Sequence, residues 1–135
     1  MAIQLSIAAR NARLDAIETT AGTAALLRIY SGSAPADCAT AASGTLLAEA
    51  SLPSDWMTAA SAGAKAKTGT WSDSSANATG TAAHFRLYDS GGTTCHMQGT
   101  VTATGGGGDM TVDSTSFTAG QVFTISTFTL TDANA

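Results

Sequence analysis

The sequence feature that most constrains the fold is a small supply of large apolar side chains. Of the 135 residues, 44% are hydrophobic, but about 28 of these are Ala. Leu, Ile, Val and Phe together number about 21, near 16% of the chain. A share below roughly 20%, when combined with a high net charge, indicates disorder. Because the net charge is only -4, the composition does not meet the full criterion for disorder. We therefore expect a folded domain with a thin core, which gains stability by associating with neighbours.

The charge balance and the distribution of apolar residues argue against two classes of partner. Six basic residues and a pI near 4.7 argue against direct binding of nucleic acid. No stretch approaches the roughly 18 apolar residues of a membrane span. The start of the chain lacks the basic leader of a secretory signal, and Arg10 and Arg13 interrupt any apolar run. We therefore expect a protein that is made in a cytoplasm and contacts neither membrane nor nucleic acid.

One helix is predicted, over residues 6–20. Ser6 can cap its first turn, Ala residues propagate it, and Gly22 follows its end. A narrow apolar stripe recurs along it at helical spacing, formed by Ile7, Leu14 and Ile17. Such a stripe favours docking on the chain's own domain, and docking on a neighbour stays open as the alternative. We divide the chain into an N-terminal arm and helix, residues 1–22, and a single β-sandwich domain, residues 23–135.

Beyond the helix the apolar side chains recur at every second position, which indicates β-strands. The segment 81–89 is the clearest case, because apolar side chains such as Phe85 alternate with polar ones such as His84. We expect His84 to face solvent, and Cys95 in the following strand to point inward. The other predicted strands cover residues 25–30, 45–50, 67–71, 95–102, 110–113 and 121–131, and residues 54–60 are predicted to form one or two helical turns.

The last predicted strand changes phase part-way along. Phe123 and Ile125 share one face, and Phe128 and Leu130 share the opposite one. A strand buried on one side cannot change phase without a bulge or a crossing between sheets, so we place a break near residues 126–127. Strands that bend between two sheets are common in sandwiches and jelly rolls. The expected fold class is therefore all-β, a jelly-roll-like β-sandwich with a short N-terminal helix.

The residue types that catalysis and metal binding need do not converge in the sequence. The only histidines are His84 and His96, and no Gly-x-Ser-x-Gly elbow occurs. The run Gly105–Gly108 lacks the Lys-Ser/Thr of a phosphate loop, and the carboxylates lack calcium-loop spacing. Zinc would need a further ligand beside Cys38, Cys95 and His96. We expect no enzyme activity, no cofactor and no metal, and a catalytic triad that assembles only in space is a minor alternative.

Two short segments of the chain match each other, and each precedes one of the two cysteines. Leu27–Tyr30 and Phe85–Tyr88 share an Arg-x-Tyr pattern, and each is followed by a Ser/Gly-rich turn and then by Cys38 or Cys95. A Cys38–Cys95 disulfide stays open, because its loop closure would stabilise by up to about 4 to 5 kcal/mol whereas a reducing cytoplasm opposes it. Arg and Tyr are typical of interface centres, so the outward-facing Arg/Tyr stripe is a candidate partner contact, formed by Arg28, Tyr30, Arg86 and Tyr88.

The two tryptophans, Trp56 and Trp71, have two interpretations. In a thin core, Trp is the largest filler available, and we expect both residues mainly in the core. If either were exposed beside Asp73, it would instead favour a β-sandwich module that binds glycans. Tryptophan is also enriched at interface hot spots.

Five segments carry a resemblance to a known class of protein. They are Met1–Asp15, Leu52–Met57, His84–Arg86, Thr94–Val101 and Phe128–Ala135. Together they resemble small virion proteins encoded in the structural gene clusters of tailed bacteriophages. Within that class, jelly-roll cement proteins bind the outer capsid surface and bridge neighbouring major capsid subunits.

The resemblance implies a capsid cement or decoration protein, located on the virion exterior after synthesis in the host bacterial cytoplasm. Its partners would be the phage major capsid protein and neighbouring copies of the chain itself, in a homo-oligomer or side by side. No site residues transfer from the family. We expect the capsid contacts to be the N-terminal segment Ala2–Ile7, through Ile3 and Leu5, and the Arg/Tyr stripe. The alternatives are a tail, collar or head–tail joining component and, from another class, the glycan-binding module.

Overall fold

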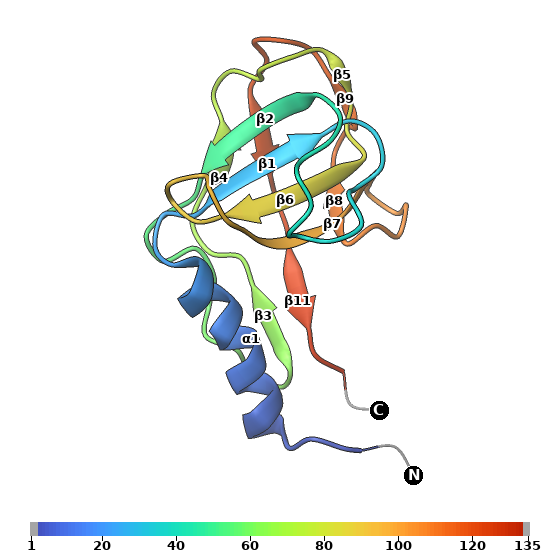
Figure 1. The fold of residues 1–135 in the computed structure, drawn as a ribbon. Helices are drawn as coiled ribbons and strands as arrows, with labels where there is room; N and C mark the ends of the chain where they lie inside the picture. Colours follow the sequence, from blue (N-terminus) through green and yellow to red (C-terminus); the bar gives the residue numbers. More distant parts are fainter. Residues whose placement is uncertain (1–2, 134–135) are drawn as a thin grey trace.

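The computed structural model describes residues 3–133, which form short β-strands and one helix that lies at the edge of the sheets beside β3 (Figure 1). The largest sheet has five strands in the order β2-β1-β6-β7-β8, and two-stranded ladders pair β10 with β4, β11 with β3 and β5 with β9. All pairs are antiparallel except β7 with β8. The elements are α1 (Ile7–Ala21), β1 (Leu26–Tyr30), β2 (Leu46–Ser51), β3 (Ala64–Ala66), β4 (Trp71–Asp73), β5 (Gly80–Thr81), β6 (His84–Tyr88), β7 (Cys95–Ala103), β8 (Met110–Val112), β9 (Ser116–Phe117), β10 (Phe123–Ile125) and β11 (Thr129–Thr131).

The fold is mostly β with one N-terminal helix, which confirms the expected class at that level. The sheets curl, consistent with a sandwich-like arrangement. The change of phase in the last predicted strand is also confirmed. Its first half is β10, which pairs with β4, and its second half is β11, which pairs with β3 in a different ladder. The chain crosses between ladders at residues 126–127, where the period breaks.

Helix α1 begins and ends where its caps predict. The hydroxyl of Ser6 accepts a hydrogen bond from the amide of Ala9 at 3.1 Å, and Gly22 closes the helix with a φ of 85°. The helix docks on its own domain, mainly through polar contacts. Buried Lys65 of β3 donates to Asp15 at 2.7 Å, and the Gly63 amide donates to the Asn11 side chain at 2.9 Å.

The core lies against the inner face of the five-stranded sheet and is joined by aromatic rings. Phe128 lies 5.6 Å from Phe85 and 5.7 Å from Trp71 between ring centroids, and Trp71 lies 6.0 Å from Trp56. Both tryptophans are 0% exposed, and their ring N–H groups donate to backbone carbonyls. The expectation that they fill the core is therefore confirmed, and the exposed tryptophan that a glycan-binding module would use is not present.

Two predicted elements between β2 and β4 are wrong. Residues 54–60 form no helical turn, because Trp56 enters the core and the backbone after it runs extended beside β3. Ala62 and Gly63 both have positive φ values, which gives the tight reversal typical of a type I′ hairpin. The strand predicted at residues 67–71 does not form as one element. Instead β3 ends at residue 66, and β4 begins at residue 71.

The faces of two residues on the main sheet also differ from expectation. His84 is 1% exposed rather than facing solvent, because a loop covers the outer face of β6. Cys95 lies on that outer face rather than inward, because a register shift between Leu87 and Tyr88 turns it toward Arg86. Such a bulge leaves no mark in the alternation of apolar residues.

We predict that Phe128→Ala lowers the free energy of unfolding by about 3–5 kcal/mol, because Phe128 joins the sheet to the tryptophans and its loss leaves a cavity. Denaturant titration measures this change. The matched control is Thr129→Ala, an exposed neighbour, which should change stability by no more than about 0.5 kcal/mol. Equal effects from the two substitutions would contradict the central position of Phe128.

Candidate functional site

A loop of residues 31–45, the covering loop, lies across the outer face of the main sheet. It leaves the end of β1, crosses in front of β6 and β7, and returns to β2 (Figure 1). Its side chains are small and mostly exposed. A loop of this composition offers little apolar area for burial, so its attachment must come from hydrogen bonds.

Three side chains from the sheet hold the covering loop through its carbonyl groups. Nη2 of Arg86 donates to the Cys38 carbonyl at 2.8 Å, and Nε2 of Gln98 donates to the Pro35 carbonyl at 2.7 Å. Nδ1 of His84 lies 2.7 Å from the Gly32 carbonyl. A carbonyl oxygen only accepts, so Nδ1 of His84 carries the proton in this contact. These polar side chains therefore bind the chain's own backbone.

The Arg/Tyr stripe is brought together as expected but does not face solvent. Arg28 of β1 is the cross-strand partner of Arg86 of β6, so the two matching segments lie side by side. Arg86 is only 1% exposed, and Tyr30 and Tyr88 are each 6% exposed. The expectation that the stripe faces solvent is wrong for these three residues, whereas Arg28 is half-buried, with 23% of its side chain exposed. The role of the stripe as a capsid contact stays a prediction, and this conformation does not offer Arg86 to a partner.

The two arginines of the stripe have unequal partners. Nε of Arg28 donates to Glu49 at 2.5 Å, whereas Nε of Arg86 donates to the Cys95 sulfur at 3.3 Å. The ring of Tyr88 lies 4.6 Å from the guanidinium carbon of Arg28 and 5.6 Å from that of Arg86. Like charges directly opposite each other on a sheet repel, and the electron-rich face of one ring offsets part of that repulsion.

A cavity of about 290 Å³ lies between the stripe and the covering loop. Burial raises the pKa of Tyr30 on its wall, and a hydrogen bond with Tyr88 raises it further. The cavity is therefore lined by two cations and two tyrosines on the sheet side, and by small side chains on the loop side. Its lining residues are Arg28, Tyr30, Cys38, Ala39, Thr40, Ala41, Ala42, Arg86, Tyr88, Gly92, Thr93 and Cys95.

The two cysteines, distant in sequence, meet in this cavity. Both are half-buried and both are free thiols. Burial raises the pKa of Cys38 to about 11, and a hydrogen bond with Cys95 contributes to the rise. The structure thus brings together the pair that the sequence proposed, and a disulfide between them stays a prediction.

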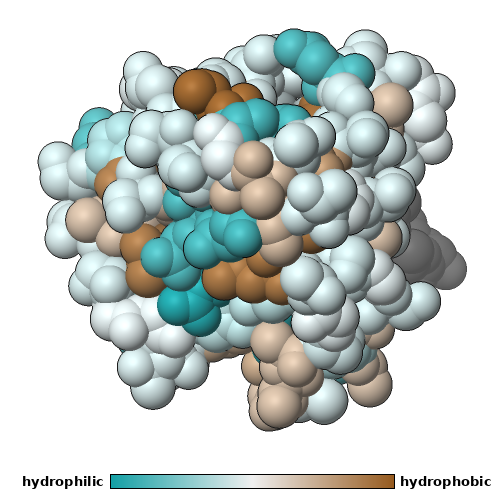
Figure 2. Space-filling model, turned by 90° about the horizontal axis from the view of Figure 1, so that it is seen from above, coloured by the Kyte–Doolittle hydropathy of each residue, from teal (hydrophilic) through white to brown (hydrophobic). Residues whose placement is uncertain are grey.

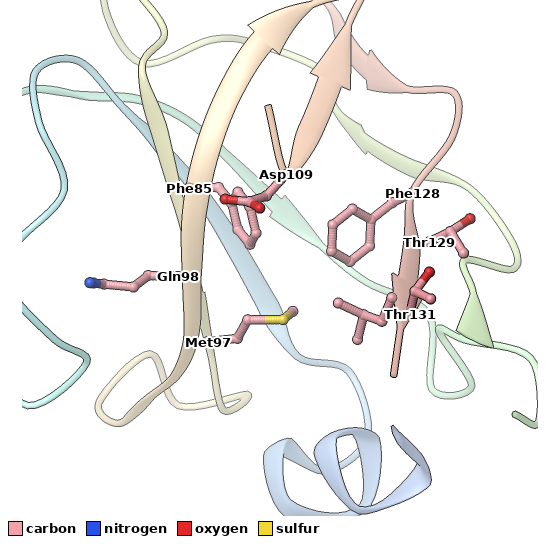
Figure 3. A pocket seen from close by; sticks show the side chains of 8 residues that line it. Phe85, Met97, Gln98, Asp109, Phe128, Thr129 and Thr131 are labelled. Carbon is pink, nitrogen blue, oxygen red and sulfur yellow. The ribbon is translucent and has the colours of Figure 1, made fainter. Parts of the chain in front are cut away.

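A second hollow, of about 390 Å³, lies between β7 and β11 (Figure 3). Figure 3 shows Phe85, Met97 and Phe128 around the hollow, with Asp109 at one side and Gln98 pointing away. Oδ2 of Asp109 already accepts hydrogen bonds from the amide and hydroxyl of Thr100, at 2.9 and 3.0 Å. The hollow is therefore lined by polar and apolar side chains alike, and its one carboxylate is engaged within the chain. Sequence patterns did not indicate it, because it arises where two ladders diverge.

The N-terminal contact residues have a different environment from the stripe. Ile3 is 85% exposed and Leu5 is half-buried, while Ala2 lies outside the described residues. Ile7, at the start of α1, is 54% exposed. Large apolar side chains in this segment are thus available at the surface, as a contact surface requires.

The described residues do not assemble a metal or catalytic centre. Within residues 3–133, no group of three or more His, Cys, Asp and Glu side chains is placed to hold a metal ion. The ring of His84 stacks on Tyr30 at 5.2 Å, whereas His96 lies in a separate hollow beside α1. In the same range, no helix combines the length and apolar character needed to cross a membrane.

Comparison with known proteins adds no identity to these observations. The chain matches no family model, no curated protein and no solved structure.

We predict that Cys38 reacts with iodoacetamide at neutral pH at least tenfold more slowly in the folded chain than in the unfolded chain. A pKa of about 11 leaves less thiolate than an unperturbed thiol with a pKa of about 8.5. The rate should continue to rise with pH beyond about 8.5, where the unfolded chain levels off. Mass spectrometry of the alkylated peptides measures the two cysteines separately. Equal alkylation rates for Cys38 in the folded and unfolded chains would contradict the burial of its thiol and its hydrogen bond with Cys95.

Proposed function

We propose that this chain is a structural protein of a tailed-bacteriophage virion, a cement or decoration protein that binds the assembled major capsid shell. The observation that carries the proposal is that the large polar side chains bind within the chain while a large apolar side chain is exposed. The large polar side chains of the main sheet hold the covering loop, whereas Ile3, before α1, is 85% exposed. Exposed apolar residues in an arm favour an assembly contact over a reaction.

The remaining surface and the thin core support the same proposal. The face in Figure 2 is mostly pale, the colour of residues with intermediate hydropathy, with small hydrophilic and hydrophobic patches. Such a surface has few groups for strong individual contacts. Many copies on one shell make weak contacts adequate, because each copy can bridge neighbouring subunits. In this proposal the curled sheets are the layers of a jelly-roll-like sandwich.

The proposed mechanism is thermodynamic. A protein that binds the assembled shell but not free subunits stabilises the shell by mass action. Neighbouring copies of the chain and the major capsid protein are the partners. A tail, collar or head–tail component would act in the same way at another place, and the copy number per particle separates that alternative from the shell.

We predict that Ile3→Asp lowers the affinity for assembled capsids by about tenfold or more, because burial of one Ile contributes roughly 2 kcal/mol. Sedimentation of purified shells with the added protein measures occupancy, and gel densitometry against the major capsid protein gives the copy number.

The matched control is Val122→Asp, which changes another apolar side chain that is 68% exposed. Neither variant should unfold more easily, which denaturant titration verifies. Normal occupancy with Ile3→Asp would remove the arm from the interface. Equal binding to free subunits and assembled shells would contradict the cement function.

A further inference from the structure

The hydrogen bonding of Arg86 is incomplete in the structure. Its Nε donates to Cys95 and its Nη2 to the Cys38 carbonyl, but Nη1 is buried without a partner. A guanidinium presents five N–H donors, and a buried donor without an acceptor destabilises the fold. Because Arg86 is 1% exposed, bulk water does not satisfy this group. Nη1 of Arg86 is therefore a buried donor that no acceptor among residues 3–133 satisfies.

The charge of Arg86 is also uncompensated. Among residues 3–133 it forms no ion pair, since the nearby Glu49 is the partner of Arg28. Asp37, on the covering loop, accepts hydrogen bonds from Thr40, which lower its pKa, and the charge of Arg86 makes a smaller contribution in the same direction. A water molecule would supply an acceptor but no charge, whereas an anion would supply both.

The cavity beside Arg86 has space and further donors for such an anion. Its volume is about 290 Å³, against about 30 Å³ for a water molecule in the liquid. The second guanidinium, Arg28, lines the same cavity, and Gly92 leaves room for it, because a Cβ at residue 92 would lie 2.6 Å from its Nη2. Thr40 and Thr93 also line the cavity, but their hydroxyls already donate to Asp37 and to the Gly91 carbonyl, so the two guanidinium groups are its main donors.

We propose that the cavity beneath the covering loop is a binding site for a compact oxyanion, held by the guanidinium groups of Arg86 and Arg28. The oxyanion is a free inorganic ion of the phosphate type or the carboxylate of an acidic molecule, since both present oxygen acceptors with negative charge. The site belongs to the isolated chain and does not rest on the virion function. A bound anion would join the covering loop to β1 and β6 at the point where Arg86 already contacts the loop.

The test is a nuclear magnetic resonance titration of the full chain with sodium phosphate, at ionic strength held constant with sodium chloride. We expect saturable shifts of the Arg86 Nε–H signal and of the amides of residues 38–42 and Thr93, and a higher midpoint of thermal unfolding. A parallel titration with sodium acetate identifies the source. Shifts with phosphate alone indicate an inorganic ion, and shifts with acetate as well indicate that carboxylates also fit. Shifts no larger than those in chloride would overturn the proposal.

Two variants and one control assign the binding to this cavity. Arg86→Gln should abolish the saturable shifts, whereas Arg13→Gln, at an arginine whose side chain is 63% exposed, should leave them unchanged. If Arg86→Gln does not fold, Ala41→Leu fills the cavity from an exposed loop position and leaves both arginines in place. Ala41→Leu should also abolish the shifts. Phosphate binding that survives in either folded variant would overturn the proposal.

Discussion

Strand β6 is buried from both sides, and the other elements are arranged around that constraint. All five of its residues are buried, although the alternate ones are polar. Its inner face carries Phe85 and Leu87 into the aromatic core. Its outer face carries Arg86 and His84, which are covered by a loop rather than by a second apolar layer. A chain with so few large apolar residues cannot cover two faces of a sheet with hydrophobic packing. Backbone carbonyls of the covering loop accept hydrogen bonds from the second face instead, although Nη1 of Arg86 stays without a partner.

The same limitation accounts for how the peripheral elements are attached. Helix α1 docks through Lys65, which is 2% exposed and donates to Asp15 and to the Thr58 carbonyl. The Trp56 ring nitrogen donates to the Gly22 carbonyl, which ties the helix end to the core. Buried charges and polar groups are stable only when they are paired. Each of these contacts therefore fixes one arrangement of the periphery, whereas apolar packing would tolerate several.

Much of the local structure could be predicted from the sequence because short-range rules decide it. Ser6 and Gly22 set the bounds of α1, and the change of phase between Ile125 and Phe128 placed the crossing between ladders. The matching segments lie in β1 and β6, which pair with each other, but a match of four residues was too short to predict that pairing. The burial of Arg86 could not be predicted, because it depends on backbone carbonyls of a loop whose residue types give no signal. The position of Cys95 depended on a bulge, and that of residues 54–60 on a tertiary contact of Trp56.

The polar outer face of the sheet is an internal layer and not a surface. Hydrogen exchange of the Arg86 Nε proton, followed by nuclear magnetic resonance, distinguishes the two. Because this proton is buried and donates to Cys95, it should exchange at least tenfold more slowly than the Nε proton of Arg13, whose side chain is 63% exposed. Equal exchange rates at the two arginines would show that the covering loop does not close over the sheet, and would contradict the account.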